Sequence, residues 1–486
     1  QVTTWSFFTN SQGYYWKKSI DYINDALLTF SQWNGDYPYD NCSAVQGPIG
    51  AGGGMEYPSI TIIGHVASDY ALNELIAHEL CHNWFYGMLG FNERDFPFLD
   101  EGLTSFNELR YMKQKHPDLK LYDYMGLSHE TAERFNIKEF KQSYFYYLMY
   151  LLSLRTNSDQ PADLPAEKFT SLNYGSIVYY KMAISFYYLM NYLGREKFDS
   201  VMQGFVEKWK FKHPYPKDMK QYFTSNTSKD LNWFFEDLTG STKFIDYKIK
   251  SAKLLEDSQK LSIKLKNKGT ISAPVPVSVS FSEKADTSFW IRGFRKKQEI
   301  TLDSVADFKK IQVNPGLIVP EFSISNNLFY RNKFFPKLEP FSLKFLTSIE
   351  RPEKNQFFYA VTPGYNYYNN FMLGILLHQL SIPPKRTKCF LLPYLSFSDH
   401  FFAGTGKIEY ETSLPGRYFR SLLFGFEGSK FATPRSKTDF HKLKFFTGIN
   451  IKDVVDEVNE KTQMFKGLTV PVRIECDPET KKFEIF

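Results

Sequence analysis

The sequence predicts a multidomain α+β fold, and three observations lead to this prediction. The chain has 486 residues, which is about three times the length of a typical domain. Apolar residues recur at helical spacing in the first half and alternate with polar residues in short segments afterwards. A hydrophobic content of 43% with 23% charged residues is typical of folded globular proteins. We therefore expect folded domains over 1–245, 246–325 and 351–486, with a linker over 326–350.

Residues 1–245 are mixed in pattern at first and mainly helical afterwards. The Gly-rich segment 47–54 leads into an apolar, strand-like segment, Ser59–Gly64. Helical periodicity marks Trp16–Phe30, Leu72–Leu89, Leu103–Lys115, Phe140–Leu154, Ser176–Leu193, Phe198–Trp209 and Leu231–Leu238.

At about Asp246 the pattern changes to short alternating segments separated by Gly, Pro and Asp residues. This run ends near Glu321, and its length and rhythm are expected of a small β-sandwich. The predicted strands are Tyr247–Lys253, Leu261–Asn267, Val275–Phe281 and Lys309–Val313.

Charge and cysteine content argue against several classes of protein. The net charge of +6 comes from basic residues scattered among acids, so nucleic acid is not expected as a partner. The four cysteines lie far apart and form no CxxC pair, which predicts neither a cysteine metal site nor a disulfide framework. No run of 18 apolar residues is present, so no transmembrane helix is expected. We interpret the start at Gln1, in the middle of a pattern, as that of a processed protein or a fragment.

The strongest chemical signal is the pentapeptide His78-Glu79-Leu80-Cys81-His82 within a helical pattern. Residues i and i+4 share one helix face, so the imidazoles of His78 and His82 can bind one metal ion. Glu79 lies about 100° round the helix from His78, near the ion without being forced to ligate it. In a zinc site of this HExxH type, such a carboxylate holds the water and takes its proton. Cys81 is expected to pack as a small apolar residue.

A third ligand is expected from a following helix, and Glu101 lies nineteen positions after His82. Three protein ligands with a fourth position left for water make an open, catalytic zinc site. The alternative is a helix with two core histidines, and the well-placed glutamate disfavours it. The sequence therefore predicts one Zn²⁺ ion bound by His78, His82 and Glu101, with Glu79 as the catalytic carboxylate.

These spacings resemble those of the gluzincin metallopeptidases, and the chain is similar to the aminopeptidase N family among them. Gly53-Gly54-Met55-Glu56-Tyr57 resembles the family's GxMEN exopeptidase motif, with Tyr57 where the family usually has Asn. The resemblance implies that Glu56 binds the substrate's free α-amine, while backbone groups at Gly53, Gly54 and Met55 align the peptide. The alternative is a plain Gly-rich turn before a strand.

Tyr179-Tyr180-Lys181-Met182 resembles the family's Y-x-K-G motif, with Met182 in place of Gly. The match implies that Tyr179 donates a hydrogen bond to the tetrahedral oxyanion. Tyr174 and Tyr180 are nearby alternatives for this role.

The resemblance implies a thermolysin-like catalytic domain followed by an Ig-like β-sandwich, and a zinc aminopeptidase that releases N-terminal residues from peptides. Two alternatives stay open. One is a zinc endopeptidase, in which Glu56 does not bind an amine. The other is a peptidase-like scaffold subunit of an outer-membrane protein assembly.

Residues 351–486 do not fit the peptidase pattern. Thr362–Leu373, Leu391–Phe397 and Phe401–Phe426 resemble strands of bacterial outer-membrane β-barrels, because alternating strands with aromatic ends are the mark of such barrels. A soluble β-sandwich with aromatic cross-strand pairs is the alternative. From the barrel resemblance we expect association with the outer membrane or its proteins, and a cell-envelope or periplasmic location.

Overall fold

The computed structural model describes residues 1–50, 53–255, 259–281, 285–303, 305, 307–331, 336, 340–351, 354–397, 402–413, 419–432, 439–451, 472–476 and 483–485. The chain divides into two compact units. Unit 1 comprises residues 1–133, 137–153 and 159–339, and unit 2 comprises residues 134–136, 154–158 and 340–486.

Unit 1 begins with a four-stranded sheet in the order β1 (Thr3–Phe7), β2 (Asn41–Gln46), β4 (Ile60–Ile63) and β3 (Gly54–Met55). The first three strands run parallel, whereas the short β3 pairs antiparallel with β4. The predicted strand over Ser59–Gly64 is confirmed as β4. The Gly-rich segment, whose residues 51 and 52 lie outside the described part, ends in the edge strand β3.

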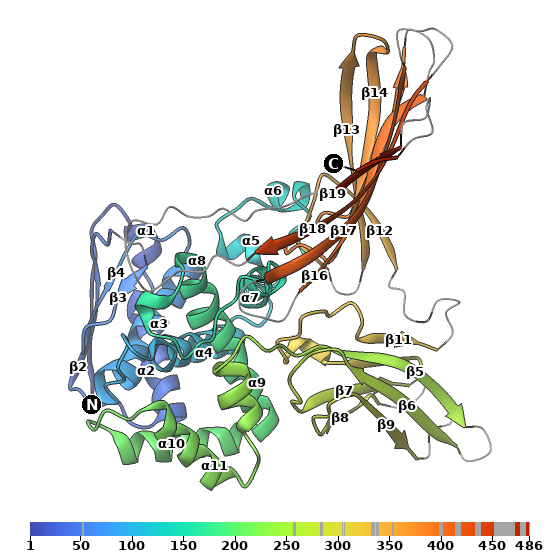
Figure 1. The fold of residues 1–486 in the computed structure, drawn as a ribbon. Coiled ribbons are helices and arrows are strands. Elements are labelled where there is room, and N and C mark those ends of the chain that lie inside the picture. The colour runs from blue at the N-terminus through green and yellow to red at the C-terminus, as the bar shows by residue number, and fades with distance from the viewer. Residues whose placement is uncertain are drawn as a thin grey trace. The chain divides into compact units, whose positions relative to one another are not determined.

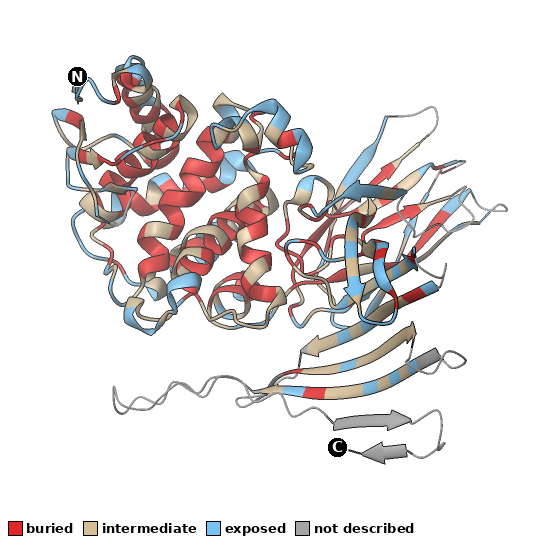
Figure 2. Cartoon of the chain, turned by 90° about the horizontal axis from the view of Figure 1, so that it is seen from above, coloured by how far each residue is buried: buried red, intermediate tan, exposed pale blue. Residues whose placement is uncertain are grey.

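Between strand β4 and the sheets that end unit 1, the chain is helical. Figure 2 shows that the buried residues of this helical part concentrate where the helices meet. The α-helices are α1 (Gly13–Trp16), α2 (Ser19–Asn34), α3 (Asp69–His82), α4 (Pro97–Lys115), α5 (Leu121–Tyr124), α6 (His129–Arg134), α7 (Tyr144–Arg155), α8 (Ser171–Asn173), α9 (Met182–Leu193), α10 (Arg195–Trp209) and α11 (Pro216–Thr227). Helical segments of π type are η1 (Asn83–Met88), η3 (Tyr174–Lys181) and η4 (Trp233–Thr239). Segments of 3-10 type are η2 (Ala166–Lys168) and η6 (Pro315–Leu317).

The predicted helices are found with bounds that differ by a few residues, and Leu231–Leu238 is mostly the π-helical η4. Three differences bear on the site. Leu72–Leu89 is α3 followed by the π-helical segment η1, and Ser176–Leu193 is the π-helical η3 followed by α9. The third, predicted over Leu103–Lys115, begins six residues earlier as α4, because Pro97 at its first position has the backbone angle that a helix start needs. This earlier start places Glu101 on the helix.

A buried ion pair fixes helix α4. Arg110 donates from both terminal nitrogens to Asp199 of α10, at 2.6 Å each. Its guanidinium also lies 3.8 Å from the centre of the Trp33 ring of α2. Paired, planar contacts of this kind are geometrically demanding, so α4 is held in register against both neighbouring helices.

Unit 1 ends in two small sheets. One has the order β5 (Tyr247–Leu255), β6 (Lys260–Asn267) and β9 (Lys297–Leu302). The other has the order β11 (Leu328–Tyr330), β10 (Lys310–Val313), β7 (Val275–Ser280) and β8 (Thr287–Ile291). Strand β5 contacts β10 and β11, and the side chains of Ile263, Val277 and Ile311 are fully buried.

The helical part and these sheets are joined by buried hydrogen bonds. The hydroxyl of Tyr188 in α9 donates to the carbonyl of Pro274, and that of Tyr147 in α7 donates to the carbonyl of Glu321. Both tyrosines are buried, so each bond satisfies a hydroxyl that has no access to water.

Unit 2 is one nine-stranded sheet in chain order, seen at the upper right of Figure 1. Its strands are β12 (Phe341–Phe345), β13 (Asn355–Asn366), β14 (Asn370–His378), β15 (Thr387–Ser396), β16 (Phe402–Ser413), β17 (Phe419–Ala432), β18 (Asp439–Ile451), β19 (Val472–Cys476) and β20 (Phe483–Ile485). Strands β12 and β13 run parallel, and every later neighbour is antiparallel.

The outcome for the C-terminal predictions is mixed. The β-rich character of residues 351–486 is confirmed, but the described strands form an open sheet and no closed barrel, because β12 and β20 do not pair with each other. Residues 401 and 414–418 of the predicted segment Phe401–Phe426 lie outside the described part. The linker predicted over 326–350 contains strands β11 and β12, which are too short to give an alternating pattern. In the part of the chain that the structure describes, no helix has both the length and the apolar character needed to cross a bilayer.

Candidate active site

Helix α3 carries the HExxH residues into the interior of unit 1. Its start is fixed by Ser68, whose Oγ accepts a hydrogen bond from the backbone N–H of Ala71 at 3.0 Å. A side-chain cap of this kind followed by an acidic first turn, here Asp69, stabilises a helix start. One turn separates His78 from His82, so their imidazoles project from the same face.

The three predicted metal ligands converge on one point. Nε2 of His78 and Nε2 of His82 are 3.3 Å apart, and each lies 3.3 Å from Oε2 of Glu101. Zinc–nitrogen bonds of ~2.0–2.1 Å at tetrahedral angles place neighbouring ligand atoms about 3.3 Å apart. The donor set and its spacing therefore fit one tetrahedral zinc ion.

Both histidines are held by carboxylates on α4. Oε2 of Glu108 lies 2.6 Å from Nδ1 of His78, and Oδ1 of Asp100 lies 2.7 Å from Nδ1 of His82. Each carboxylate accepts a hydrogen bond from Nδ1–H, which leaves Nε2 with a lone pair for the metal. No role was predicted for Glu108 from the sequence. It lies seven residues after Glu101, two turns along the same face of α4, and this spacing could have identified it.

The charges around the three predicted ligands favour a positive charge between them. Burial alone would raise the pKa of Glu101, but the neighbouring His82 and His78 imidazoles hold it well below its usual range. Burial alone would likewise lower the pKa of His78, yet Glu101 and Glu108 raise it to about 10. A bound metal dication would supply the charge that protons otherwise provide, so the electrostatics also fit the ion.

Glu79 is buried beside the triad and packs against strand β3. Burial raises its pKa to about 7, although the two neighbouring histidines oppose this shift. A Cβ atom added at Gly54 would overlap the carboxyl group of Glu79. Glycine at position 54 is therefore what allows this carboxylate to reach the edge of the sheet.

The Gly-rich segment forms the wall of the cavity that contains the triad. This cavity has a volume of about 420 Å³, and Gly53, Gly54 and Glu56 line it. Ligand atoms of Glu56, Glu79 and His82 all lie within 4.8 Å of one another, so the carboxyl group of Glu56 lies beside the triad. Met55 is exposed and does not belong to the lining, so only its backbone could contribute to peptide alignment.

Tyr179 also lines the cavity. Its hydroxyl donates to Oε1 of Glu101 at 2.5 Å, and its ring stacks on that of His78 with the centroids 6.0 Å apart. Burial, followed by the charge of Glu101, raises the pKa of Tyr179 far above its usual value, so the hydroxyl stays protonated and able to donate. It is presented by the π-helical segment η3, a kind of helix irregularity that often occurs at functional sites.

The two alternative tyrosines are placed differently. Tyr174 packs edge-on against the Tyr179 ring, and the cavity lining does not include it. Tyr180 does line the cavity, but its ring packs against Phe145 and Tyr146, away from the contacts that Tyr179 makes with the triad. Cys81 is fully buried, as expected for a packing residue.

Comparison with known families gives one match over this part of the chain. Residues 19–238, which include all the residues of the candidate site, match the peptidase family M1 domain. This part of the chain is therefore similar to an M1 peptidase domain. It is 23% identical over 219 residues to endoplasmic reticulum aminopeptidase 1 of Mus musculus, a match that covers 41% of this chain and 21% of that protein.

Two further similarities were found. The crystal structure of Legionella pneumophila aminopeptidase A in complex with aspartic acid matches the chain with a TM-score of 0.49 and 15% identity, over 65% of this chain and 36% of that one. A 38-residue segment, 8% of the chain, is 55% identical to large ribosomal subunit protein uL11 of Methanopyrus kandleri and covers 23% of that protein. The chain spans between about a fifth and a quarter of the length of the curated relatives it matches.

Proposed function

We propose that this part of the chain is a zinc aminopeptidase, which removes the N-terminal residue of peptides. The observation that carries the proposal is the triangle of His78, His82 and Glu101 ligand atoms, 3.3 Å on each side, with Glu56 and Glu79 beside it. A general peptidase needs the triad and Glu79 alone. The additional carboxylate of Glu56, at one side of the triad, provides an anchor for a protonated α-amine and so favours an exopeptidase.

In this proposal His78, His82 and Glu101 would hold a zinc ion, which would supply acidification of the attacking water and polarisation of the scissile carbonyl. Glu56 fixes the amino terminus of the substrate by charge pairing. Glu79 takes a proton from the water and later passes it to the leaving amine. Tyr179 donates its hydroxyl proton in a hydrogen bond to the oxygen that becomes negatively charged.

The test compares aminoacyl-amide reporters with the same reporters acetylated at the amine. Chelator-sensitive cleavage of the free-amine set alone supports the aminopeptidase. Cleavage of both sets favours the endopeptidase alternative, because Glu56 would then have no amine to bind. If the zinc-loaded protein cleaves neither set, the peptidase proposal is wrong and a scaffold role is favoured.

We also propose that unit 2 associates with a lipid bilayer through one face of its sheet. Strand pairing places apolar side chains in register on this face, and many of them are exposed: Val361, Tyr365, Phe371, Leu373, Ile375, Leu391, Leu395, Phe402, Ile408, Phe424, Phe445 and Ile449. On β13 this row runs from Phe357 to Tyr365, about 26 Å at ~3.3 Å per residue, close to the ~25 Å apolar band of membrane β-proteins.

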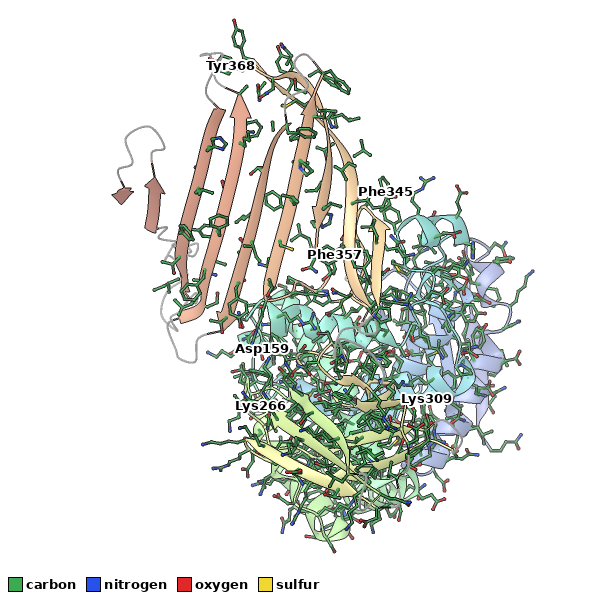
Figure 3. The ribbon with its side chains drawn as sticks, turned by 90° about the vertical axis from the view of Figure 1, so that its right-hand side faces the viewer. Asp159, Lys266, Lys309, Phe345, Phe357 and Tyr368 are labelled. Carbon is green, nitrogen blue, oxygen red and sulfur yellow. The ribbon has the colours of Figure 1, made fainter. Side chains whose placement is uncertain are left out.

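The opposite face of the same sheet is charged. Lys388 lies 3.3 Å from Glu411, and Lys407 lies 2.5 Å from Glu409. Aromatic residues gather at the end of the β13–β14 hairpin, where Figure 3 labels Tyr368. One apolar and one charged face, with aromatic residues at a strand end, match a sheet that has lipid on one side and water on the other.

Flotation of the full chain with phosphatidylcholine vesicles tests this second proposal. We expect the protein to float with the vesicles, and the double variant Phe424→Asp and Phe445→Asp to stay in the aqueous fraction. Glu427→Gln on the charged face is the matched control. Wild-type protein that remains in the aqueous fraction contradicts the proposal.

A further inference from the structure

The cavity continues past the metal-ligand triad into a second cluster of polar side chains. Glu74 lies one helical turn before His78 on α3, and its neighbours in the cavity wall come from other segments of unit 1. The lining at this end comprises Glu74, Glu108, Tyr124, Gln142, Tyr146 and Tyr180.

In the proposed binding mode, this end of the cavity is on the leaving-group side of the scissile bond. Ligand atoms of Glu56, Glu79 and His82 lie within 4.8 Å of one another, whereas Glu108, next to Glu74, contacts His78. A substrate whose amine is held by Glu56 and whose scissile carbonyl lies at the triad must therefore extend toward Glu74. Four residues of helix cover about 6 Å, which is within the reach of a long side chain on the residue after the scissile bond.

The carboxylate of Glu74 is incompletely paired. Oε1 accepts hydrogen bonds from Nε2 of Gln142 at 2.6 Å and from the hydroxyl of Tyr146 at 3.0 Å. Oε2 is buried at the cavity wall and makes no well-formed hydrogen bond within the described part of the chain, although the Tyr124 hydroxyl is near enough to lower the pKa of Glu74 against the effect of burial. A buried carboxylate oxygen without a donor is costly, so a donor from a bound substrate would be favoured.

The nearby carboxyl group of Glu108 also favours a positively charged group beside Glu74. The single hydroxyl proton of Tyr146 lies between Glu74 and Glu108 and cannot serve both. Burial and the neighbouring Glu108 raise the pKa of Glu74 well above its usual range, and a cation bound beside the two carboxyl groups would favour the ionised form of Glu74. Phe145 and Tyr180 line the cavity near them and offer apolar surface for the methylene stem of a long cationic side chain.

We infer that Glu74 is the specificity-determining residue of a pocket for the side chain that follows the scissile bond, and that this pocket selects lysine or arginine. The inference rests on the proposed aminopeptidase function. It adds to that function a preference on the leaving side of the bond, which neither the triad nor Glu56 determines.

Peptide amides of the form Leu-X-Ala test the inference, with X as lysine, arginine, Nε-acetyl-lysine, norleucine or glutamate. We expect kcat/KM for lysine and arginine to exceed that for norleucine and acetyl-lysine by about tenfold or more, and glutamate to be the poorest. Acetyl-lysine keeps the stem of lysine but is uncharged and bulkier, whereas norleucine keeps the stem and lacks only the ammonium group, so the two together separate charge from size in the wild-type protein. Equal kcat/KM for lysine and acetyl-lysine overturns the inference.

The variant Glu74→Gln tests whether Glu74 is responsible for the preference for lysine after the scissile bond. In Glu74→Gln, the ratio of kcat/KM for lysine over norleucine should fall to near one, whatever the absolute activity of the variant. The exposed Glu196→Gln is the matched control and should keep the wild-type ratio. A preference that persists in Glu74→Gln assigns it to other residues and overturns the role of Glu74.

Reporters with no residue after the scissile bond separate this inference from the proposed function. Cleavage of Leu-amide reporters without a lysine preference in the peptides contradicts the pocket and leaves the aminopeptidase standing. Absence of any cleavage contradicts the proposed function, and the inference falls with it.

Discussion

Gly54 lies directly against the carboxyl group of Glu79, so closely that a single added carbon would overlap it. The contact links the two motifs that the sequence shows separately, the Gly-rich segment and the HExxH helix. It gives the glycine a positioning role in addition to the peptide alignment that the family resemblance implies.

We predict that Gly54→Ala displaces Glu79 while the protein still folds and binds zinc. A shift of about 1 Å in a catalytic group can cost about 100-fold in rate, and we expect a loss of that order in kcat. Steady-state kinetics together with metal analysis measure it. The control is Gly50→Ala, since an added Cβ there has no neighbour within 4 Å. Wild-type kcat in Gly54→Ala would contradict the positioning role.

Glu79→Gln should abolish turnover and leave zinc bound. The amide cannot take a proton from water, and general-base catalysis typically contributes about 10²–10⁴-fold. Activity and zinc content of the purified variant are the two measurements. Near-normal activity would show that another group accepts the proton.

Glu108→Gln should weaken zinc binding, because the amide is a poorer acceptor for Nδ1–H of His78 than the carboxylate at 2.6 Å. Loss of such a supporting contact typically costs about 10–100-fold in metal affinity. Competition with a chromophoric chelator measures the change, with Glu196→Gln as control. Unchanged affinity would mean that Glu108 does not support the ligand.

Tyr179→Phe separates the three candidate tyrosines. Loss of one oxyanion donor typically lowers kcat by about 10²–10³-fold, and we expect this with little change in KM. Tyr174→Phe should stay within a few-fold of wild type, because Tyr174 does not line the cavity. The opposite ranking of the two variants would move the catalytic role to Tyr174.

The local motifs predicted the core of the site better than they predicted the fold around it. His78 and His82 follow from helical spacing, Glu101 follows from its position nineteen residues after His82, and the structure brings the three ligand atoms together. Glu74 and Gln142 are 68 positions apart, so their contact arises only when the helices pack. Glu108 has a visible periodic relation to Glu101, but the pattern does not say that His78 will lie opposite it.

The C-terminal region shows what alternation can and cannot predict. Parts of β16 and β18 are visible in the sequence, because Ile408 and Tyr410 in one and Leu443, Phe445 and Ile449 in the other alternate with mostly polar positions. Whether such strands close into a barrel depends on how the first and last strands pair, and alternation carries no information about that. The π-helical segments η1 and η3 escape prediction for a related reason, since a single shifted hydrogen bond hardly changes the periodicity.

The central claim, a zinc aminopeptidase, is tested most directly by titrating metal-free protein with Zn²⁺ while following hydrolysis of a leucine-amide reporter and its acetylated counterpart. For a zinc aminopeptidase, we expect cleavage of the free-amine reporter to rise linearly to a plateau at one zinc per chain. The acetylated reporter should stay intact. Cleavage that does not depend on zinc, or equal cleavage of both reporters, would contradict it.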